Sequence, residues 1–246
     1  MNPPPTPPRD IWLRQLDDQN RAATRLICFP HAGGSATAFR PWLDHWNAAP
    51  ELWSVQYPGR EERAEEPPPK ELPRMAGEIA VALQWMTDKS YAFFGHSMGA
   101  LAAYETTCQL LRLGLPLPTL LIASGSAPPK TSRPPAAAAG QDDIAWLGTS
   151  EAAADDELQA ITQRTLSSDL EMLAHYDPGP SPSRLPVPLT ALRYRDDPEL
   201  DVETCRRWNA LTQGPFTETT LPGDHFACYR QPEGTVKLLR RVWNRW

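Results

Sequence analysis

Ser97 lies in a sequence pattern that is typical of nucleophilic serines. Residues 95–99 read G-H-S-M-G and match the pattern G-x-S-x-G, in which a strand turns abruptly into a helix and exposes the serine hydroxyl at the apex. Four aromatic or apolar residues precede the pattern, and an amphipathic segment follows it. This is the strand-turn-helix setting that the turn requires. The pattern therefore predicts a nucleophilic Ser97 rather than a structural turn.

A serine hydroxyl is a poor nucleophile at neutral pH and needs a base to accept its proton, with a carboxylate that fixes the tautomer of the base. After this kind of turn, the acid and then the histidine follow the serine along the chain. Only His175 and His225 lie downstream of Ser97. His225 follows a predicted strand, whereas His175 lies beside Tyr176 in a helical segment. We therefore predict His225 as the base.

The candidates for the acid lie in the loop after a predicted strand at residues 187–192. This loop is near the carboxyl end of a strand, where open sheets place their sites. It holds four carboxylates, Asp196, Asp197, Glu199 and Asp201. Spacing alone does not choose among them.

The tetrahedral oxyanion of acyl transfer needs two backbone N–H donors. One comes from the residue after the nucleophile, Met98, and the other from the loop that follows an early strand. Residues 30–34, P-H-A-G-G, lie in that loop. We expect the second donor from Ala32, because the glycine pair permits a close approach of the backbone.

Strands and helices alternate along the chain. Short apolar runs that end at proline or glycine predict buried strands at residues 25–29, 52–56, 91–94, 119–123, 187–192 and 216–221. Apolar residues at three- and four-residue spacing predict helices around residues 75–86, 101–115, 202–211 and 234–246. A crossover between parallel strands has to traverse one face of the sheet. The fold class is therefore α/β, with a mostly parallel sheet flanked by helices.

Proline supplies 28 of the 246 residues, and 18 of these fall in four clusters, at 3–8, 67–73, 128–135 and 178–188. Proline interrupts helices and central strands, so the clusters mark boundaries between packed elements. The first indicates a disordered tail over residues 1–10, followed by a single domain over 11–246. The last two bracket an inserted helical lid at about 129–178, whose apolar stripe is Leu158, Ile161, Leu166, Leu170 and Leu173.

Composition excludes several classes of protein. The chain has a formal charge of -6 and lacks the basic stripe that sequence-independent binding of nucleic acids requires. We therefore expect no nucleic-acid partner. No segment approaches the roughly 18 apolar residues of a membrane span, and the first residues lack the features of a signal peptide, so we expect a soluble, cytoplasmic protein. The scattered cysteines indicate neither a metal site nor a disulfide framework and are expected as reduced core thiols: Cys28, Cys108, Cys205 and Cys228.

Four blocks together resemble the type II thioesterases that accompany polyketide synthases and nonribosomal peptide synthetases. They are L-I-C-F-P-H-A-G-G at 26–34, Q-Y-P-G-R at 56–60, F-G-H-S-M-G-A at 94–100 and P-G-D-H-F at 222–226. The joint presence of F-P-H-A-G-G and Y-P-G-R is far more specific than G-x-S-x-G. The resemblance spans roughly residues 13–229. It implies an α/β-hydrolase fold with a helical lid over an acyl chamber.

The resemblance also implies site residues. The family pattern after the sixth strand is approximately A-L-G-G-x-x-D-P, and A-L-R-Y-R-D-D-P at residues 191–198 aligns with it to place the acid at Asp197, with Asp196 as the alternative. Arg193 and Tyr194 replace the two usual glycines, so the backbone of this loop is expected to differ from the family's. The amides of Ala32 and Met98 are implied as the oxyanion hole.

The implied reaction is hydrolysis of an acyl thioester from the phosphopantetheine arm of a carrier protein, which clears stalled or wrongly loaded units. Ser97 would attack, Asp197 would orient His225, and water would release the acid. The implied partner is an acyl or peptidyl carrier protein, and no cofactor, metal, nucleic acid or membrane is expected. We also expect a monomer.

Carrier proteins are commonly acidic, so a chain of charge -6 should dock through local basic or apolar patches. The candidates are Arg206, Arg207, Arg230, Arg240 and Arg241, for which a solvated face of an arginine-rich chain is the simpler interpretation. Other functions stay open: a product-releasing thioesterase or acyltransferase, a carboxylesterase, and a non-catalytic binding protein on a hydrolase fold.

Overall fold

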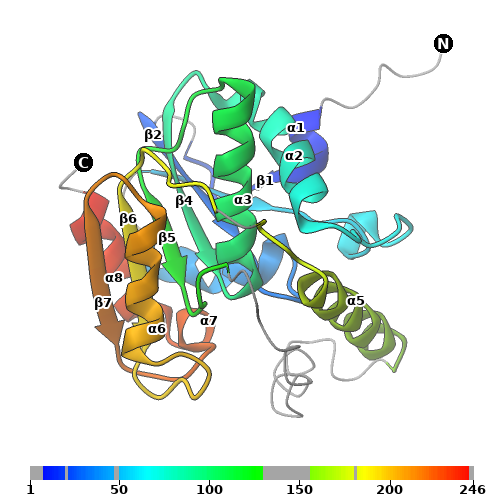
Figure 1. The fold of residues 1–246 in the computed structure, drawn as a ribbon. Helices are drawn as coiled ribbons and strands as arrows, with labels where there is room; N and C mark the ends of the chain where they lie inside the picture. Colours follow the sequence, from blue (N-terminus) through cyan, green and yellow to red (C-terminus); the bar gives the residue numbers. More distant parts are fainter. Residues whose placement is uncertain (1–7, 20–21, 47–49, 130–155, 180–181, 244–246) are drawn as a thin grey trace.

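The computed structural model describes residues 8–19, 22–46, 50–129, 156–179 and 182–243 (Figure 1). Its centre is a seven-stranded sheet in the order β1-β3-β2-β4-β5-β6-β7. Every neighbouring pair is parallel except β1 and β3. The strands are β1 (Leu13–Gln15), β2 (Thr24–Phe29), β3 (Glu51–Val55), β4 (Ser90–His96), β5 (Leu121–Ser124), β6 (Leu189–Tyr194) and β7 (Phe216–Leu221). The predicted α/β class with a mostly parallel sheet is confirmed.

Helices cover both faces of this sheet (Figure 1). One face packs against α1 (Pro8–Trp12), α2 (Leu72–Leu83), α3 (Met98–Leu113) and the segment formed by α6 (Val202–Arg206) and the 3-10 helix η5 (Arg207–Leu211). The other packs against the 3-10 helix η1 (Ala36–His45), α7 (Ala227–Arg230) and α8 (Pro232–Trp243). Two short 3-10 helices, η2 (Glu61–Arg63) and η3 (Gln84–Met86), complete these connections.

Strand β2 shows why the sequence has uninterrupted apolar runs. Ile27 and Phe29 belong to the core on one face of the sheet, and Leu26 and Cys28 belong to the core on the other. A central parallel strand is covered on both sides, so residues of either parity are apolar. The four cysteines are free and buried, as predicted.

The elements differ from the predicted ones mainly at their ends. Strand β6 was expected from residue 187 but begins at Leu189, because Pro188 has no N–H to donate to the sheet. The short antiparallel β1 and the helix α1 were not predicted. The predicted tail is wrong for residues 8–10, which open α1. Burial of Trp12, with the Arg63 guanidinium 4.3 Å from its ring centroid, anchors this helix.

Helix α5 (Asp156–Ala174) coincides with the apolar stripe of the predicted lid. It lies at the lower right of Figure 1, on the opposite side from β6 and β7. Leu166 and Met172 are buried, and Leu170 and Leu173 pack against the core. Residues 1–7 of the predicted tail and residues 130–155 of the predicted lid lie outside the described residues, so the domain boundaries stay predictions. Within the described part of the chain, no helix is long and apolar enough to cross a membrane.

Candidate active site

Ser97 occupies a strained turn between β4 and α3. Its φ of 55° and ψ of -120° fall where residues other than glycine are rare, a kind of strain that collects at functional sites. A Cβ on Gly95 would lie 2.2 Å from the Gly99 carbonyl oxygen, and one on Gly99 would lie 2.0 Å from the Phe29 carbonyl oxygen. Only glycine permits these approaches. The predicted strand-turn-helix setting of Ser97 is therefore present.

His225 and Asp197 meet at the carboxyl ends of β6 and β7. The Nδ1 atom of His225 lies 2.8 Å from Asp197 Oδ2, and the Asp197 side chain is fully buried. The second oxygen, Oδ1, accepts from the Glu199 N–H at 2.9 Å. An ionised carboxylate only accepts, so Nδ1 carries the proton and Nε2 is the nitrogen that can receive one.

The other candidate acids have structural partners instead. Asp196 accepts from the Gly223 N–H at 3.2 Å and donates its own N–H to the Gly223 carbonyl at 2.9 Å, which joins the loop after β6 to the loop that carries His225. Asp201 caps α6 by accepting from the Thr204 N–H at 2.7 Å. Glu199 is exposed. Of the four carboxylates, the structure thus brings Asp197 to the histidine.

The unusual Arg193 and Tyr194 are the last two residues of β6, and their side chains contact the segments that follow. Tyr194 is buried and its hydroxyl lies 3.0 Å from Thr235 Oγ1. Arg193 donates to the carbonyls of Tyr194 at 3.3 Å and Leu200 at 3.2 Å. The bulkier residues are accommodated because one enters the core and the other bridges the loop.

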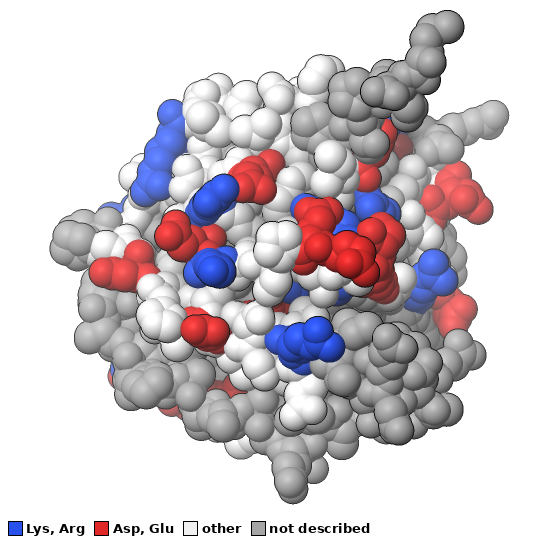
Figure 2. Space-filling view, turned by 90° about the vertical axis from the view of Figure 1, so that its right-hand side faces the viewer, with Lys and Arg blue, Asp and Glu red and all other residues white. Residues whose placement is uncertain are grey.

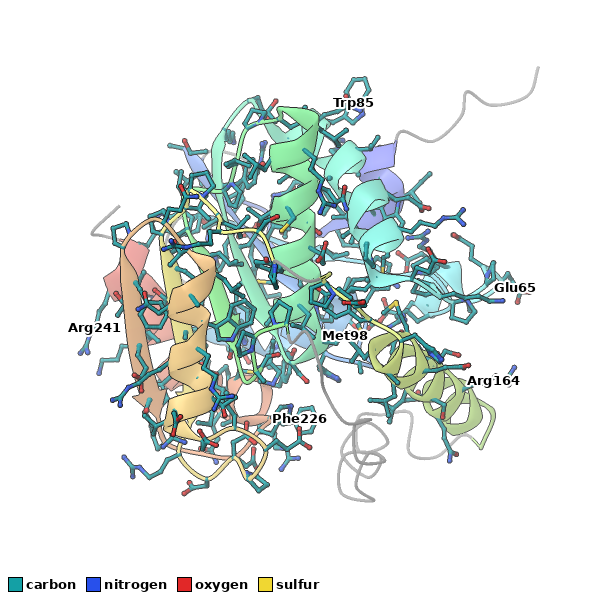
Figure 3. All side chains as sticks on the ribbon, viewed as in Figure 1. Glu65, Trp85, Met98, Arg164, Phe226 and Arg241 are labelled. Atoms are coloured by element: carbon teal, nitrogen blue, oxygen red, sulfur yellow. The ribbon has the colours of Figure 1, made fainter. Side chains whose placement is uncertain are left out.

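Aromatic rings hold His225 beside the turn of Ser97. The ring of His96, the residue before Ser97, lies 4.9 Å from the His225 ring, and Phe226 packs edge-on at 5.0 Å. Figure 3 shows Phe226 on the same lower side of the sheet as Met98, at the start of α3. Burial, and then the positive charge that His225 and His31 can carry, lower the pKa of His96 well below its ordinary value. His96 is therefore a neutral neighbour of His225.

The other histidine downstream of Ser97, His175, lies elsewhere. It is exposed at the end of α5, and its Nδ1 is 2.8 Å from the carbonyl oxygen of Glu171 one turn earlier. His175 therefore makes a local contact with its own helix, and its role as a lid residue stays a prediction.

The loop after β2 forms a tight turn at the predicted oxyanion segment. The Gly34 N–H donates to the His31 carbonyl at 3.0 Å, and Gly33 has a φ of 76°, as a type II turn requires at its third position. His31 Nδ1 lies 2.8 Å from the Ala32 carbonyl oxygen, so this nitrogen carries the proton. Burial lowers the pKa of His31 to about 4. The ring is therefore neutral at physiological pH and donates to the turn.

Side chains from two other segments also hold this loop, and sequence reasoning assigned them no role. Tyr57 donates to the Pro30 carbonyl at 3.3 Å, Gln56 accepts from the Ala36 N–H at 2.7 Å, and Arg60 donates to the Gly34 carbonyl at 2.8 Å. Gln56, Tyr57 and Arg60 all belong to the Q-Y-P-G-R block of the family resemblance, which could have indicated that they matter. Asp169 of α5 accepts from the Gly33 N–H at 2.7 Å, and a single polar residue in an amphipathic helix gives no such signal.

The predicted basic patch is largely neutralised by its surroundings. Arg206 pairs with Glu218, Arg207 with Glu203, and Arg230 with Asp224, at 2.6, 3.5 and 3.0 Å. These pairings favour a solvated face. On the face seen in Figure 2, positive and negative side chains are likewise interspersed. Among the described residues, no group of three or more His, Cys, Asp or Glu side chains could hold a metal ion.

Comparisons with known proteins identify the family of this chain. The family model for a thioesterase domain matches residues 24–243. The chain is 36% identical over 222 residues to a probable cadicidin biosynthesis thioesterase of Streptomyces griseus, a match that covers 87% of this chain and 61% of the relative. It is 34% identical to the thioesterase PikA5 of Streptomyces venezuelae, with 88% of this chain and 79% of that protein covered.

Solved structures give the same picture. The type II thioesterase BorB from the borrelidin biosynthetic cluster superimposes with a TM-score of 0.79 at 30% identity, over 94% of this chain and 97% of BorB. RedJ, a thioesterase of the prodiginine pathway in Streptomyces coelicolor, gives a TM-score of 0.75 at 34% identity, over 92% and 91%. The predicted α/β-hydrolase fold and the predicted resemblance to type II thioesterases are confirmed, and the chain belongs to the thioesterase family.

Proposed function

We propose that this protein hydrolyses acyl thioesters from the phosphopantetheine arm of acyl or peptidyl carrier proteins, and so removes stalled or misloaded units in polyketide or nonribosomal peptide biosynthesis. Family membership supports thioester hydrolysis. Two similar type II thioesterases support the biosynthetic setting: BorB, from the borrelidin cluster, and YbtT, from the yersiniabactin pathway. The observation that carries the mechanism is the 2.8 Å contact between His225 Nδ1 and buried Asp197, beside the strained turn of Ser97.

In the proposed acylation step, Ser97 Oγ attacks the thioester carbonyl while His225 Nε2 accepts its proton. Buried Asp197 stabilises the imidazolium that forms. The tetrahedral intermediate then collapses with cleavage of the C–S bond, and His225 returns the proton to the departing thiolate. In the second step, His225 takes a proton from water, which attacks the acyl-serine, and the carboxylic acid leaves as Ser97 is regenerated.

Two backbone amides would stabilise the negative oxygen of both intermediates. The N–H groups of the first turn of a helix have no partner within the helix, and they lie at its positive end. Met98 is the first residue of α3. Ala32 is only 9% exposed in the turn after β2, and the contact of Gly99 with the Phe29 carbonyl sets the start of that loop against α3. Thiolate leaves readily, so positioning and oxyanion stabilisation are the main demands on such a site.

The test uses carrier proteins loaded with varied acyl groups and mass spectrometry of the carriers after incubation. The wild-type protein should free the acyl group, and Ser97→Ala should lower turnover on the order of 10⁶-fold. Ser167→Ala, at an exposed serine on α5, is the matched control and should retain wild-type turnover.

Three outcomes would contradict the proposal. Turnover retained by Ser97→Ala would exclude the serine mechanism. Faster cleavage of the matching oxygen ester would identify a carboxylesterase. Transfer of the acyl group to an added alcohol or amine, in preference to water, would identify an acyltransferase.

A further inference from the structure

Asp169 of helix α5 contacts the turn at residues 31–34. This helix is separate from the sheet and from the helices that cover its two faces. The central peptide of the turn joins the Ala32 carbonyl to the Gly33 N–H. His31 Nδ1 donates to that carbonyl at 2.8 Å, and Asp169 Oδ2 accepts from that N–H at 2.7 Å. One peptide plane is therefore fixed from both edges, by its own loop on one side and by helix α5 on the other.

A second set of contacts fixes Asp169 itself. Its two oxygens accept from Arg60 Nη1 and Nη2, each at 2.8 Å, in a paired arrangement. The Asp169 side chain is fully buried and the Arg60 side chain is 4% exposed. The same Arg60 Nη1 donates to the Gly34 carbonyl at 2.8 Å. The carboxylate of α5 and the guanidinium of the Y-P-G-R segment thus form one buried unit around Gly33 and Gly34.

One more hydrogen bond joins α5 to the neighbouring Y-P-G-R segment. Thr165, one turn before Asp169, donates to the Gly59 carbonyl at 3.2 Å. Beside it, a pocket of about 330 Å³ is lined by Arg164 of α5 and by Glu65 and Glu66, and Figure 3 shows Arg164 and Glu65 at the same edge of the molecule. Asp169 is the α5 residue whose side chain accepts a hydrogen bond from the turn in the described part of the chain.

The orientation of the central peptide matters because a type II turn and a type I turn differ by its rotation. In the observed orientation the Gly33 N–H points to Asp169. Rotation would direct the Ala32 carbonyl oxygen toward a buried carboxylate, so the charge of Asp169 opposes it. The same rotation would change the backbone at Ala32, whose N–H is the proposed oxyanion donor.

We propose that Asp169 is a positioning residue, which couples the seating of lid helix α5 to the geometry of the oxyanion loop. The proposal rests on the proposed function, because it needs the Ala32 N–H to act on the reacting carbonyl. Asp169 acts through the turn and has no contact with the reacting atoms. When α5 moves away from the turn, the Gly33 N–H loses the Asp169 carboxylate as its acceptor. The turn then loses the contact that favours the peptide orientation needed for hydrolysis.

The test compares two double variants that differ in one respect. Arg60→Met with Asp169→Asn and Arg60→Met with Asp169→Leu both remove the buried ion pair and keep side chains of similar size. Only asparagine can accept from the Gly33 N–H. We measure kcat and KM on a short acyl thioester of a pantetheine analogue, the rate of Ser97 inactivation by a fluorophosphonate, and thermal unfolding.

The asparagine double variant should keep kcat within about 5-fold of the wild type, and the leucine double variant should lose about 10- to 100-fold, below the loss of a whole oxyanion donor. KM should change less than about 3-fold. Inactivation by the fluorophosphonate should slow in parallel with kcat, because the phosphonyl oxygen is also stabilised by the N–H groups of the oxyanion hole. Equal kcat in two folded double variants would overturn the proposal. The Ser97→Ala variant is assayed in parallel, so a failure of the proposed function is recognised separately.

Amide hydrogen exchange of the wild-type protein tests the same coupling even if a double variant does not fold. The Gly33 amide should be protected, and it should exchange at the rate at which the α5 amides around Asp169 open. Rapid exchange of Gly33 while the α5 amides stay protected would also overturn the proposal.

Discussion

Two arginine-carboxylate networks, each centred on a buried arginine, lie at opposite ends of the sheet. At the amino ends of the strands, Arg25 of β2 pairs with Glu51 of β3 at 2.8 Å and with Asp88 before β4, and Glu51 also accepts from Lys89. At the carboxyl ends, Arg60 pairs with Asp169 of α5. The first network joins strands that already pair with each other. The second joins the core to helix α5 of the predicted lid and reaches the predicted oxyanion turn.

The comparison teaches that the place of an ion pair, rather than its chemistry, decides what it can control. The hydrogen bonds that Lys89, Arg25 and Trp53 donate to Glu51 outweigh the effect of burial and lower its pKa, so the amino-end network is ionised at neutral pH. The hydrogen bonds of Arg25 and Glu51 in the described part of the chain involve no predicted site residue, so we expect this network to affect folding alone. The carboxyl-end network is built from the same groups but can influence turnover.

The largest expected effect lies at the carboxyl ends. Asp197→Asn should lower kcat on the order of 10⁴-fold, because an amide no longer holds His225 in the tautomer that accepts a proton at Nε2. Steady-state kinetics and circular dichroism measure turnover and folding. Asp196→Asn, one residue away and bonded to Gly223 instead of His225, is the control and should stay within a few-fold of the wild type. A greater loss in the Asp196 variant would show that the structure pairs the wrong aspartate with His225.

The next effect should fall on stability alone. Arg25→Met removes one partner of the amino-end network and leaves Glu51 buried with less compensation, so the free energy of unfolding should fall by about 3 kcal/mol. Urea unfolding at pH 7.5 measures this loss. The kcat of the folded variant should equal that of the wild type. A kcat reduced 10-fold or more would break the distinction between the two ends of the sheet.

The smallest effect concerns the neutral His31 in the predicted oxyanion turn. Its pKa is about 4 in the folded protein and about 6.5 when unfolded. Below pH 6.5 the unfolded chain binds a proton that the folded protein does not, so stability falls as the pH falls. Between pH 7.5 and pH 5 this contributes a loss of about 2 kcal/mol. Urea unfolding should show that His31→Gln loses about that much less than the wild type over the same window; equal losses would contradict the buried neutral ring.

The parts of the site that the sequence predicts are those carried by local spacing. The turn of Ser97 follows from five consecutive residues and the elements beside them. His225 follows from chain order and from the strand before it. Spacing left four carboxylates open after β6; the resemblance favoured Asp197, and only the folded loop, in which Asp196 bonds to Gly223, shows which one meets His225.

Contacts between distant segments escaped prediction. Asp169 and Gly33 are 136 positions apart, and a polar residue among the apolar ones of an amphipathic helix normally faces water. Nothing local indicates that this one is buried against an arginine. The three-residue strand β1 was missed for a related reason, since its pairing with β3, rather than its own short sequence, makes it a strand.

The position of Asp169 on α5 has a consequence for protein engineering. Lids are attractive modules to exchange between thioesterases, because a chimera could then accept a different acyl chain without a change in the catalytic core. In this protein helix α5 of the predicted lid also supplies the acceptor for Gly33 and the counter-ion for Arg60. A grafted lid that lacks a carboxylate at this place would bury an unpaired guanidinium and release the turn. A productive exchange would have to carry that aspartate along, or replace Arg60 at the same time.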